Sequence, residues 1–217
     1  MIFEDRADAG RRLAAGLLAY AGGQARVLAL ARGGVPVGYE VARALQAPLD
    51  VFVVRKIGAP GREELAIGAI ASGGVRVLNP DTIALLGVDE QTIEAITQRE
   101  LRELERREDA YRGGLPAPDV QGSTVILIDD GLATGASMQA AIVAVHRRNP
   151  AAVVVAVPVA PQDTCVMLEK CVDELVVLAM PEPFRGVGMW YNDFSQVSDE
   201  EVRDLLRDAA RTVGPSS

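Results

Sequence analysis

The sequence predicts an α/β domain built on a parallel β-sheet with helices on both faces. Short, uniformly apolar segments recur along the chain, and a stretch with the spacing of an amphipathic helix follows most of them. Strands that are apolar on both sides are typical of parallel sheets, because helices cover both faces of such a sheet. The length of 217 residues suits one such domain and leaves room for a full-sized core.

Five apolar segments are the predicted strands of this sheet. The first two, with the helix between them, form a strand-helix-strand unit whose crossover implies parallel pairing. The predicted strands are residues 27–31, 51–54, 124–128, 153–159 and 174–178. The predicted helices around them are residues 5–20, 35–45, 136–148, 162–169 and 198–212.

A long excursion, residues 57–122, separates the second and third predicted strands. Apolar segments on either side of Ser72-Gly73-Gly74 predict a β-hairpin. Residues 89–112 predict a charged helix with a narrow apolar stripe, whose arginines are expected to face solvent in i,i+4 pairs. The expected pairs are Glu103 with Arg107 and Glu108 with Arg112. Two alternatives stay open for this helix: one of its arginines contacts a ligand, or the helix forms part of a dimer interface.

Charge and hydropathy restrict the partners of this chain. The 30 acidic and 22 basic residues give a net charge of −8, which disfavours a broad nucleic-acid or membrane surface but not a local basic pocket for a phosphate ligand. The longest apolar runs are too short to cross a bilayer, and the N-terminus lacks the pattern of a signal peptide. We therefore expect a cytoplasmic protein that binds small molecules.

The single histidine and the two cysteines exclude several kinds of site. A histidine-rich metal centre is impossible with His146 alone, and this residue is expected to lie in solvent near the end of a helix. Cys165 and Cys171 are too few for a disulfide framework, so we expect plain thiols in or near the core.

The most informative stretch is Val125-Ile-Leu-Ile-Asp-Asp-Gly-Leu-Ala-Thr-Gly-Ala-Ser-Met138. It consists of an apolar strand, two adjacent carboxylates, a loop of small residues and the start of a helix. In a parallel sheet this loop lies at the carboxyl end of its strand, where ligands bind. The amides of residues 131–137 and the hydroxyls of Thr134 and Ser137 form a donor site suited to a phosphate. The carboxylates are placed to accept hydrogen bonds from hydroxyls of the same ligand, so the sequence predicts a sugar-phosphate site.

This stretch closely resembles the phosphoribosyl-pyrophosphate (PRPP) signature of the type I phosphoribosyltransferases. The resemblance implies the α/β fold of that family, with an inserted hairpin and helix and a C-terminal hood. It also implies that the two acids hold the ribose hydroxyls and that the following loop wraps the 5′-phosphate. The residues implied to bind PRPP here are Asp129, Asp130, Gly131, Leu132, Ala133, Thr134, Gly135, Ala136 and Ser137.

A second landmark of the family follows the first predicted strand. Ala31-Arg32-Gly33-Gly34-Val35-Pro36 looks like the pyrophosphate loop, where glycine lets the backbone approach the diphosphate and arginine supplies a fork for it. Arg55-Lys56, expected to end the second strand, is similar to basic residues near the pyrophosphate, with a solvated strand end as the alternative. The resemblance thus adds Arg32, Gly33 and Gly34 to the PRPP site, and implies Asp129, Asp130, Arg32 and Lys56 as catalytic residues.

The resemblance also implies how the single domain is organised. Its parts are a core at about residues 24–180, an inserted loop region at about 57–122, a hood at about 181–197 and a C-terminal helix at about 198–212. The inserted region matches the mobile catalytic loop of the family, which closes over PRPP and excludes water. The hood is expected to contact the acceptor through Phe184, Val187 and Trp190, and plain packing is the alternative for the two aromatic residues.

Two departures from the family pattern concern the acceptor and the metal. Ala133 stands where the 6-oxopurine enzymes carry an acid that acts on the purine, so a purine mechanism that uses this acid is absent. The loop is nearer to that of orotate enzymes, which also lack the acid, but nothing specifies orotate. Trp190 stands where the hypoxanthine-guanine enzymes carry an aspartate that assists magnesium. We therefore expect Mg²⁺ to be held mainly through PRPP, with no direct contact to the protein.

The resemblance implies transfer of the 5-phosphoribosyl group from Mg-PRPP to a nitrogen acceptor, a nucleobase or a related compound, with release of pyrophosphate. Such an enzyme would serve nucleotide and nucleoside metabolism, and the family implies a homodimer. The alternative is a regulatory protein that senses PRPP or a nucleotide with little turnover. A Rossmann dehydrogenase or a P-loop nucleotidase is disfavoured because the sequence lacks Gly-x-Gly-x-x-Gly and Gly-Lys-Ser/Thr.

Overall fold

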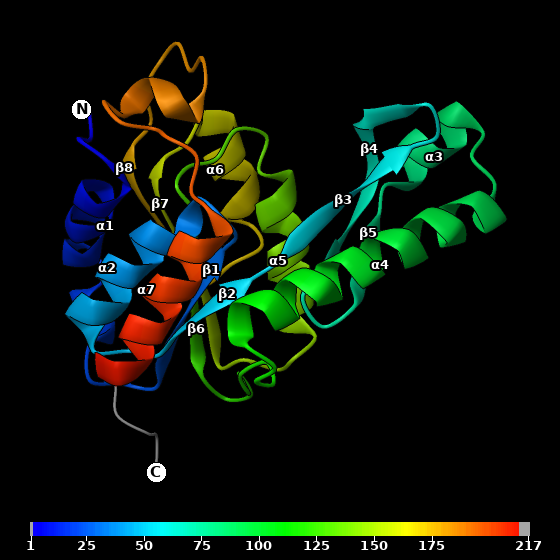
Figure 1. Cartoon of the computed structure of the whole chain (residues 1–217). Coiled ribbons are helices and arrows are strands. Elements are labelled where there is room, and N and C mark those ends of the chain that lie inside the picture. The colour runs from blue at the N-terminus through cyan, green and yellow to red at the C-terminus, as the bar shows by residue number, and fades with distance from the viewer. Residues whose placement is uncertain (1, 213–217) are drawn as a thin grey trace.

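The computed structural model describes residues 2–212, apart from the side chain of Glu64. Its centre is a five-stranded sheet in the order β2-β1-β6-β7-β8, in which every neighbouring pair is parallel (Figure 1). The strands are β1 (Ala25–Leu30), β2 (Leu49–Phe52), β6 (Thr124–Ile128), β7 (Ala152–Val159) and β8 (Glu174–Ala179). The predicted parallel sheet is confirmed.

Helices cover both faces of this sheet. The first face carries α1 (Arg6–Ala15), with the 3₁₀ turn η1 (Leu18–Tyr20) after it, and α2 (Gly34–Leu45), beside which lies α7 (Asp199–Thr212). The second face carries α5 (Ala136–His146) and α6 (Gln162–Leu168). Alternate residues of each strand enter the two layers, so that Val27 packs with α1 and α2 whereas Leu28 packs with α5 and α6. This alternation explains why the strands are apolar throughout.

The strand order reverses between β1 and β6. From β1 the chain crosses through α2 to β2, and from β6 it crosses through α5 to β7, on the opposite side. The crevice outside the carboxyl ends of the strands at such a point is where α/β sheets bind ligands. The loops after β1 and β6 therefore border the crevice in which a ligand site is expected.

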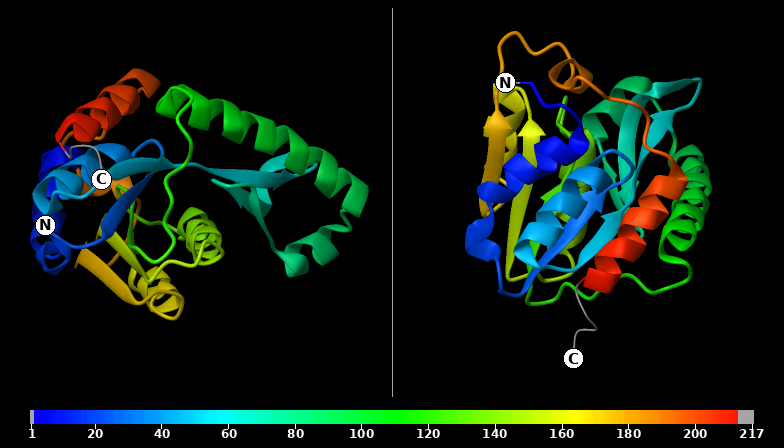
Figure 2. Two further views of the ribbon diagram at one scale, coloured as in Figure 1. Left: turned by 90° about the horizontal axis from the view of Figure 1, so that it is seen from below. Right: turned by 60° about the vertical axis from the view of Figure 1, so that its left-hand side comes forward.

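The inserted region forms a second, antiparallel sheet with two helices. Strands β3 (Val54–Ala59), β4 (Arg62–Ala71) and β5 (Val75–Leu78) pair in that order, and the predicted hairpin joins β4 to β5. Helix α3 (Pro80–Leu86), which the sequence analysis missed, precedes the predicted charged helix, α4 (Glu90–Arg112). The small sheet contacts α4 and α5, and the whole unit extends from one side of the core (Figure 2).

The apolar run 51–54, predicted as one strand, divides at Val53. Strand β2 ends at Phe52, and the amide of Val53 donates to Oγ of Ser72 at 2.8 Å while its carbonyl accepts from the amide of Ser72 at 2.8 Å. Ser72 therefore diverts the chain into the second sheet. Arg55 and Lys56 consequently lie within β3 and not, as predicted, at the end of a core strand.

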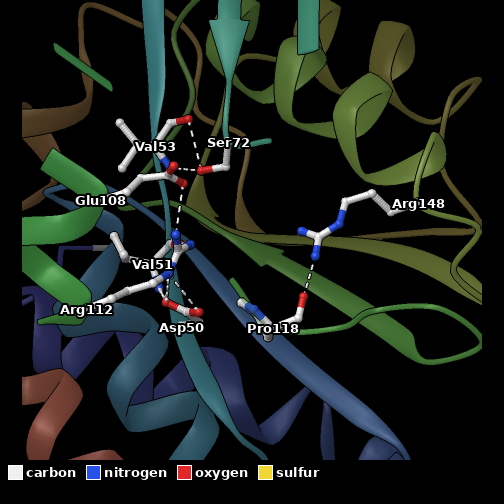
Figure 3. A network of polar contacts seen from close by, with 8 residues as sticks. All are labelled: Asp50, Val51, Val53, Ser72, Glu108, Arg112, Pro118 and Arg148. Atoms are coloured by element: carbon white, nitrogen blue, oxygen red, sulfur yellow. Dashed lines mark hydrogen bonds and ion pairs between the residues drawn. The ribbon is translucent and has the colours of Figure 1, made fainter. Parts of the chain in front are cut away.

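A buried ion pair anchors the end of α4 to the core (Figure 3). Arg112 donates from Nε to both carboxylate oxygens of Asp50 at 3.1 Å and from Nη2 to the carbonyl of Val51 at 2.9 Å. The two predicted i,i+4 pairs are present, but the Arg112 side chain is only 8% exposed, so its predicted solvation was wrong. Burial raises the pKa of Asp50, and the Arg112 guanidinium acts against this rise.

The single histidine lies away from the two loops, whereas Cys165 packs in the same buried cluster as Leu132 of the loop after β6. His146 ends α5, at the opposite end from the loop after β6, and is exposed as expected. Cys165 is buried, whereas Cys171 is exposed because it lies in the turn after α6, which corrects the expectation of a near-core thiol. Among residues 2–212, no helix is both long and apolar enough to cross a membrane.

Replacing Arg112 by methionine should destabilise the fold by about 3 kcal/mol, because the buried Asp50 carboxylate would lose its partner. Arg106 lies on the same helix with its side chain 65% exposed, so Arg106→Met should change the free energy of unfolding little. Urea unfolding of the two variants measures the difference. Equal losses would show that Arg112 does not anchor α4.

Candidate functional site

Two glycines bring the loop after β1 against the loop after β6. A β-carbon on Gly33 would lie 2.1 Å from Oδ2 of Asp130. A β-carbon on Gly34 would lie 2.6 Å from the carbonyl oxygen of Ile128 and 2.9 Å from Cα of Asp129. The backbone atoms that face Gly34 leave no room for a side chain, so glycine is required there, whereas a β-carbon on Gly33 would displace the Asp130 carboxylate. The Ala31–Arg32 peptide bond at the start of this loop is cis.

Asp129 and Asp130 follow β6 directly and lie in the crevice between these loops. The amide of Asp130 donates to Oδ1 of Asp129 at 2.9 Å. Burial raises the pKa of Asp129 well above its ordinary value, and the neighbouring Asp130 raises it further. Burial also raises the pKa of Asp130, against the opposing effect of Arg6. Paired carboxyls with perturbed pKa values at the carboxyl end of a central strand are typical of functional sites.

Arg6, in the first turn of α1, contacts the second of these acids. Its Nε donates to Oδ2 of Asp130 at 2.8 Å, and its Nη1 donates to the carbonyl of Ser195 at 2.7 Å. Its guanidinium carbon lies 3.9 Å from the centroid of the Phe194 ring. Arg6 was not predicted from the sequence, because a partner 124 residues away leaves no spacing signal.

The loop between β6 and α5 has the form of an anion site. Gly135, with φ of +73°, precedes the first residue of α5, and a β-carbon there would lie 2.8 Å from Thr164. The amide of Leu132 donates to the carbonyl of Val159 at 2.9 Å, so it is not one of the free donors that the sequence predicted. Within the described part of the chain, the amides of residues 134–137 donate to no carbonyl or side chain. These amides and the N-terminus of α5 suit a phosphate.

Arg32 lies at the end of β1, beside the C-terminal helix. Its Nη1 is 3.6 Å from Oδ1 of Asp199, the first residue of α7, and Tyr111 of α4 donates its hydroxyl to the same oxygen at 2.6 Å. The hydrogen bond from Tyr111 and the charge of Arg32 lower the pKa of Asp199. Burial raises the pKa of Tyr111 to about 12. Arg32 therefore has a carboxylate partner within the site.

The two other predicted basic residues differ in their surroundings. Nη2 of Arg55 lies 2.6 Å from Oε2 of Glu100, a buried residue of α4, so Arg55 attaches the helix to β3. Lys56 is exposed and lies opposite Ala69 in β4. Among the described residues, no hydrogen bond or ion pair brings Lys56 to the two loops.

The hood is joined to the N-terminal segment and to the acid pair. Phe3 forms a parallel bridge with Tyr191. The amide of Phe3 donates to the carbonyl of Trp190 at 2.8 Å, and the amide of Asn192 donates to the carbonyl of Phe3 at 2.9 Å. The hydroxyl of Tyr191 donates to the backbone carbonyl of Asp130 at 2.5 Å. The first residues of the chain thus fix the hood above the crevice.

The three candidate acceptor contacts, Phe184, Val187 and Trp190, are half-buried and pack against an apolar cluster that joins the hood to the N-terminal segment and to β7. The cluster consists of Phe3, Ala9, Val159 and Tyr191. Val187 also covers the loop after β6, since a β-carbon on Gly131 would lie 2.6 Å from its Cγ1. Among the described residues, Nε1 of Trp190 is buried without a hydrogen-bond partner. The structure therefore brings Val187 to the predicted phosphate loop and places the two aromatic residues within the hood.

Known proteins are similar to this chain in sequence and in structure. A family model described as phosphoribosyl transferase domain matches residues 2–189. A Mycobacterium tuberculosis protein named as a phosphoribosyl transferase, found in two strains, is 45% identical over 210 residues, which are 97% of this chain and 47% of that protein. The chain thus spans about half the length of these curated relatives. The crystal structure of the protein TT1426 from Thermus thermophilus has 44% identity and a TM-score of 0.83, over 96% of this chain and 99% of that one.

Gly34→Ala should destabilise the fold by about 1–3 kcal/mol, despite the higher helix propensity of alanine, because the new β-carbon would meet the backbone after β6. Gly23 precedes β1, and a β-carbon there would have the Tyr20 carbonyl oxygen as its nearest neighbour, at 3.6 Å. Gly23→Ala should therefore change stability by less than about 0.5 kcal/mol. Denaturant unfolding compares the two. A Gly34→Ala variant as stable as the control would contradict the required contact between the loops.

Proposed function

Because this chain belongs to the phosphoribosyl transferase family, we propose that it transfers the 5-phosphoribosyl group of Mg-PRPP to a nitrogen acceptor and releases pyrophosphate. The contact between the loop after β1 and the acid pair after β6, at the switch point of the sheet, carries the proposal. This contact supports the proposal because the acid pair, which could accept hydrogen bonds from hydroxyls, lies beside two loops whose backbone suits phosphates. The acceptor class is a nucleobase or a related nitrogen compound.

Each part of the site has one proposed task in binding PRPP. Asp129 and Asp130 accept hydrogen bonds from the ribose hydroxyls. The amides of residues 131–137 other than that of Leu132, with the hydroxyls of Thr134 and Ser137, anchor the 5′-phosphate. The proposed pyrophosphate contacts are Arg32, the backbone at Gly33 and Gly34, and the exposed Lys56.

In the proposed reaction the protein forms no covalent bond with the substrate. A nitrogen of the acceptor attacks C1 of the ribose, the bond from C1 to the pyrophosphate oxygen breaks, and its electron pair leaves with pyrophosphate through an oxocarbenium-like state. The acid pair orients the ribose, while Arg32 and Lys56 stabilise the charge that develops on the leaving group. No side chain becomes attached to the sugar.

The described residues fit a magnesium ion that the substrate carries. Among residues 2–212, no group of three or more His, Cys, Asp or Glu side chains is arranged to hold a metal. Mg²⁺ usually keeps several waters and is bound in large part by substrate phosphates. Neutralisation of the leaving pyrophosphate is the chemistry that Mg²⁺ supplies when it is bound.

Ala133 and the hood bear on the proposed acceptor. Ala133 is exposed in the phosphate loop, and its carbonyl accepts a hydrogen bond from the buried Thr164 at 2.7 Å. This position therefore offers the acceptor a methyl group and no acid. Recognition of the acceptor falls to the hood, for which we propose Val187, Phe184 and Trp190 as contacts.

A PRPP-sensing regulator is the second candidate function, and the pairing of Arg32 with Asp199 favours it. A carboxylate beside Arg32 reduces the stabilisation that this arginine can give to a departing pyrophosphate, whereas the contacts proposed for the ribose and the 5′-phosphate do not involve Arg32. Pyrophosphate release from Mg-PRPP, measured separately with nucleobases and small amines, distinguishes the two functions. Release that depends on one acceptor establishes the transferase and its acceptor class, whereas binding of PRPP without release across the panel supports the sensor.

The double substitution Asp129→Asn with Asp130→Asn should keep the fold and lose Mg-PRPP binding, because asparagine matches the volume of aspartate but removes both negative acceptors. Isothermal calorimetry measures the affinity and circular dichroism checks the fold. The same variant should lose acceptor-dependent pyrophosphate release. Unchanged PRPP affinity in the folded double variant would refute the assigned ribose site.

Asp199→Asn should bind Mg-pyrophosphate about fivefold more tightly, since Arg32 would no longer face a carboxylate at 3.6 Å in a partly exposed pair. Asp204→Asn is the matched control, because Asp204 lies on the same helix and pairs with the exposed Arg207 instead. Competition between pyrophosphate and PRPP gives both inhibition constants. Identical constants in the two variants would exclude a pyrophosphate contact for Arg32.

A further inference from the structure

We infer that Arg6 is a positioning residue of the ribose site, which holds Asp130 by one carboxylate oxygen and ties this acid to the hood. The inference rests on the proposed function, because its effect is on PRPP. Arg6 itself contacts protein groups in the structure and needs no contact with the ligand.

The geometry separates the two oxygens of Asp130. Oδ2 accepts from Nε of Arg6 at 2.8 Å and is the oxygen nearer to Gly33, where a β-carbon would lie 2.1 Å from Oδ2 and 3.2 Å from Oδ1. Oδ2 is thus enclosed by the protein on two sides. A carboxylate accepts through both of its oxygens, so Oδ1 is the oxygen left to receive a ribose hydroxyl. Arg6 therefore determines which way the acid faces.

The hood in turn fixes the guanidinium of Arg6. Its Nη1 is held by the carbonyl of Ser195, and its plane rests on the ring of Phe194, so the side chain is only 11% exposed. The Phe194 ring lies 5.0 Å from that of Tyr191, whose hydroxyl donates to the backbone of Asp130. The hood thus contacts Asp130 by two routes, one through Arg6 and one through Tyr191. A planar fork that stacks and bonds at once is a property of arginine and not of lysine.

The position of Arg6 in its helix supports a role outside helix stability. Asp5 caps α1 by accepting from the amide of Asp8 at 2.7 Å, so Arg6 is the first helical residue. A cation there opposes the positive end of the helix dipole. The favourable interaction of Arg6 is therefore with Asp130, in another part of the fold.

Arg6 also affects the charge of Asp130. The titratable groups that face this carboxyl are Arg6 from α1, Asp129 from the same loop and Tyr191 from the hood. Burial raises the pKa of Asp130, and Arg6 is the cation that opposes the rise. Without Arg6 the pKa of Asp130 rises further, so the carboxylate form that accepts a hydroxyl persists only at higher pH.

The experiment measures Mg-PRPP affinity as a function of pH for wild type, Arg6→Gln, Arg6→Lys and Arg12→Gln. Arg12 is the matched control, since it lies on the same helix, pairs with Asp8 at 2.7 Å and lies over the Phe3 ring. We expect Arg6→Gln to bind PRPP about tenfold more weakly than wild type. As the pH falls and Asp130 takes up a proton, the affinity of this variant should be lost at a pH about one unit higher than in wild type. Arg6→Lys should keep the wild-type pH dependence but bind more weakly, and Arg12→Gln should match wild type.

The other results overturn either the positioning role of Arg6 or the proposed function. Arg6→Gln with the affinity and pH profile of the control, or with weaker binding and no shift along the pH axis, would overturn the positioning role through Asp130. If Arg6→Gln does not fold, the comparison of Arg6→Lys with Arg12→Lys decides, and equal affinities overturn the role. In an Asp130→Asn background, a further tenfold loss on Arg6→Gln would also overturn it. Wild type that binds no Mg-PRPP would overturn the proposed function, and this inference with it.

Discussion

Gly34 lies so close to the backbone of Ile128 and Asp129 that no β-carbon fits there, and Gly33 lies directly against the Asp130 carboxylate. This contact follows from the reversal of strand order between β1 and β6, which opens a crevice at the carboxyl ends of these strands. Because glycine has no side chain, the loop after β1 contributes only its backbone here. Backbone amides and the two carboxylates therefore line the crevice. A ligand that carries hydroxyls between two phosphate groups matches such a lining, since each group meets a different loop.

The crowding of the two loops also disfavours ionisation of the two carboxyls. Two adjacent carboxyls in a crowded crevice hold their protons more strongly, and the pKa of both is raised. The described groups that favour ionisation are the amide of Asp130, which donates to Asp129, and the guanidinium of Arg6. Hydroxyls of a bound sugar would add donors to the charged form and favour it further. Ligand binding and loss of protons from the acid pair are therefore linked, so the chemistry of the site depends on the residues around the pair as well as on the pair.

The sequence predicted those parts of the molecule that depend on local pattern. The five strands, their helices and the phosphate loop follow from runs of apolar and small residues, and all lie close to the expected bounds. Contacts between distant segments leave no such pattern. The sequence predicted Val53 as part of a strand, but in the structure Val53 forms its hydrogen bonds with Ser72. It predicted Arg112 as a solvated partner of Glu108, but the contact with Asp50 largely buries Arg112. Within the candidate site, the motifs predicted the acid pair and Arg32, whereas Arg6 and Asp199 enter through the packing of the N-terminal and C-terminal helices, which leaves no local pattern.

These distant contacts also constrain how the inserted region can move. Helix α4 is fixed to β2 through Arg112 and to β3 through Glu100, and Tyr111 links its end to the Asp199 that faces Arg32. A displacement of the whole helix would break two partly buried ion pairs, which is more costly than bending an exposed turn. Any closure of the insertion over a ligand is therefore confined to the part beyond these anchors, where β4 and β5 meet α5 next to the phosphate loop. The anchored end of α4 lies beside the loop after β1, because Tyr111 and Arg32 meet at Asp199, so any such closure would take place against this fixed end of the helix.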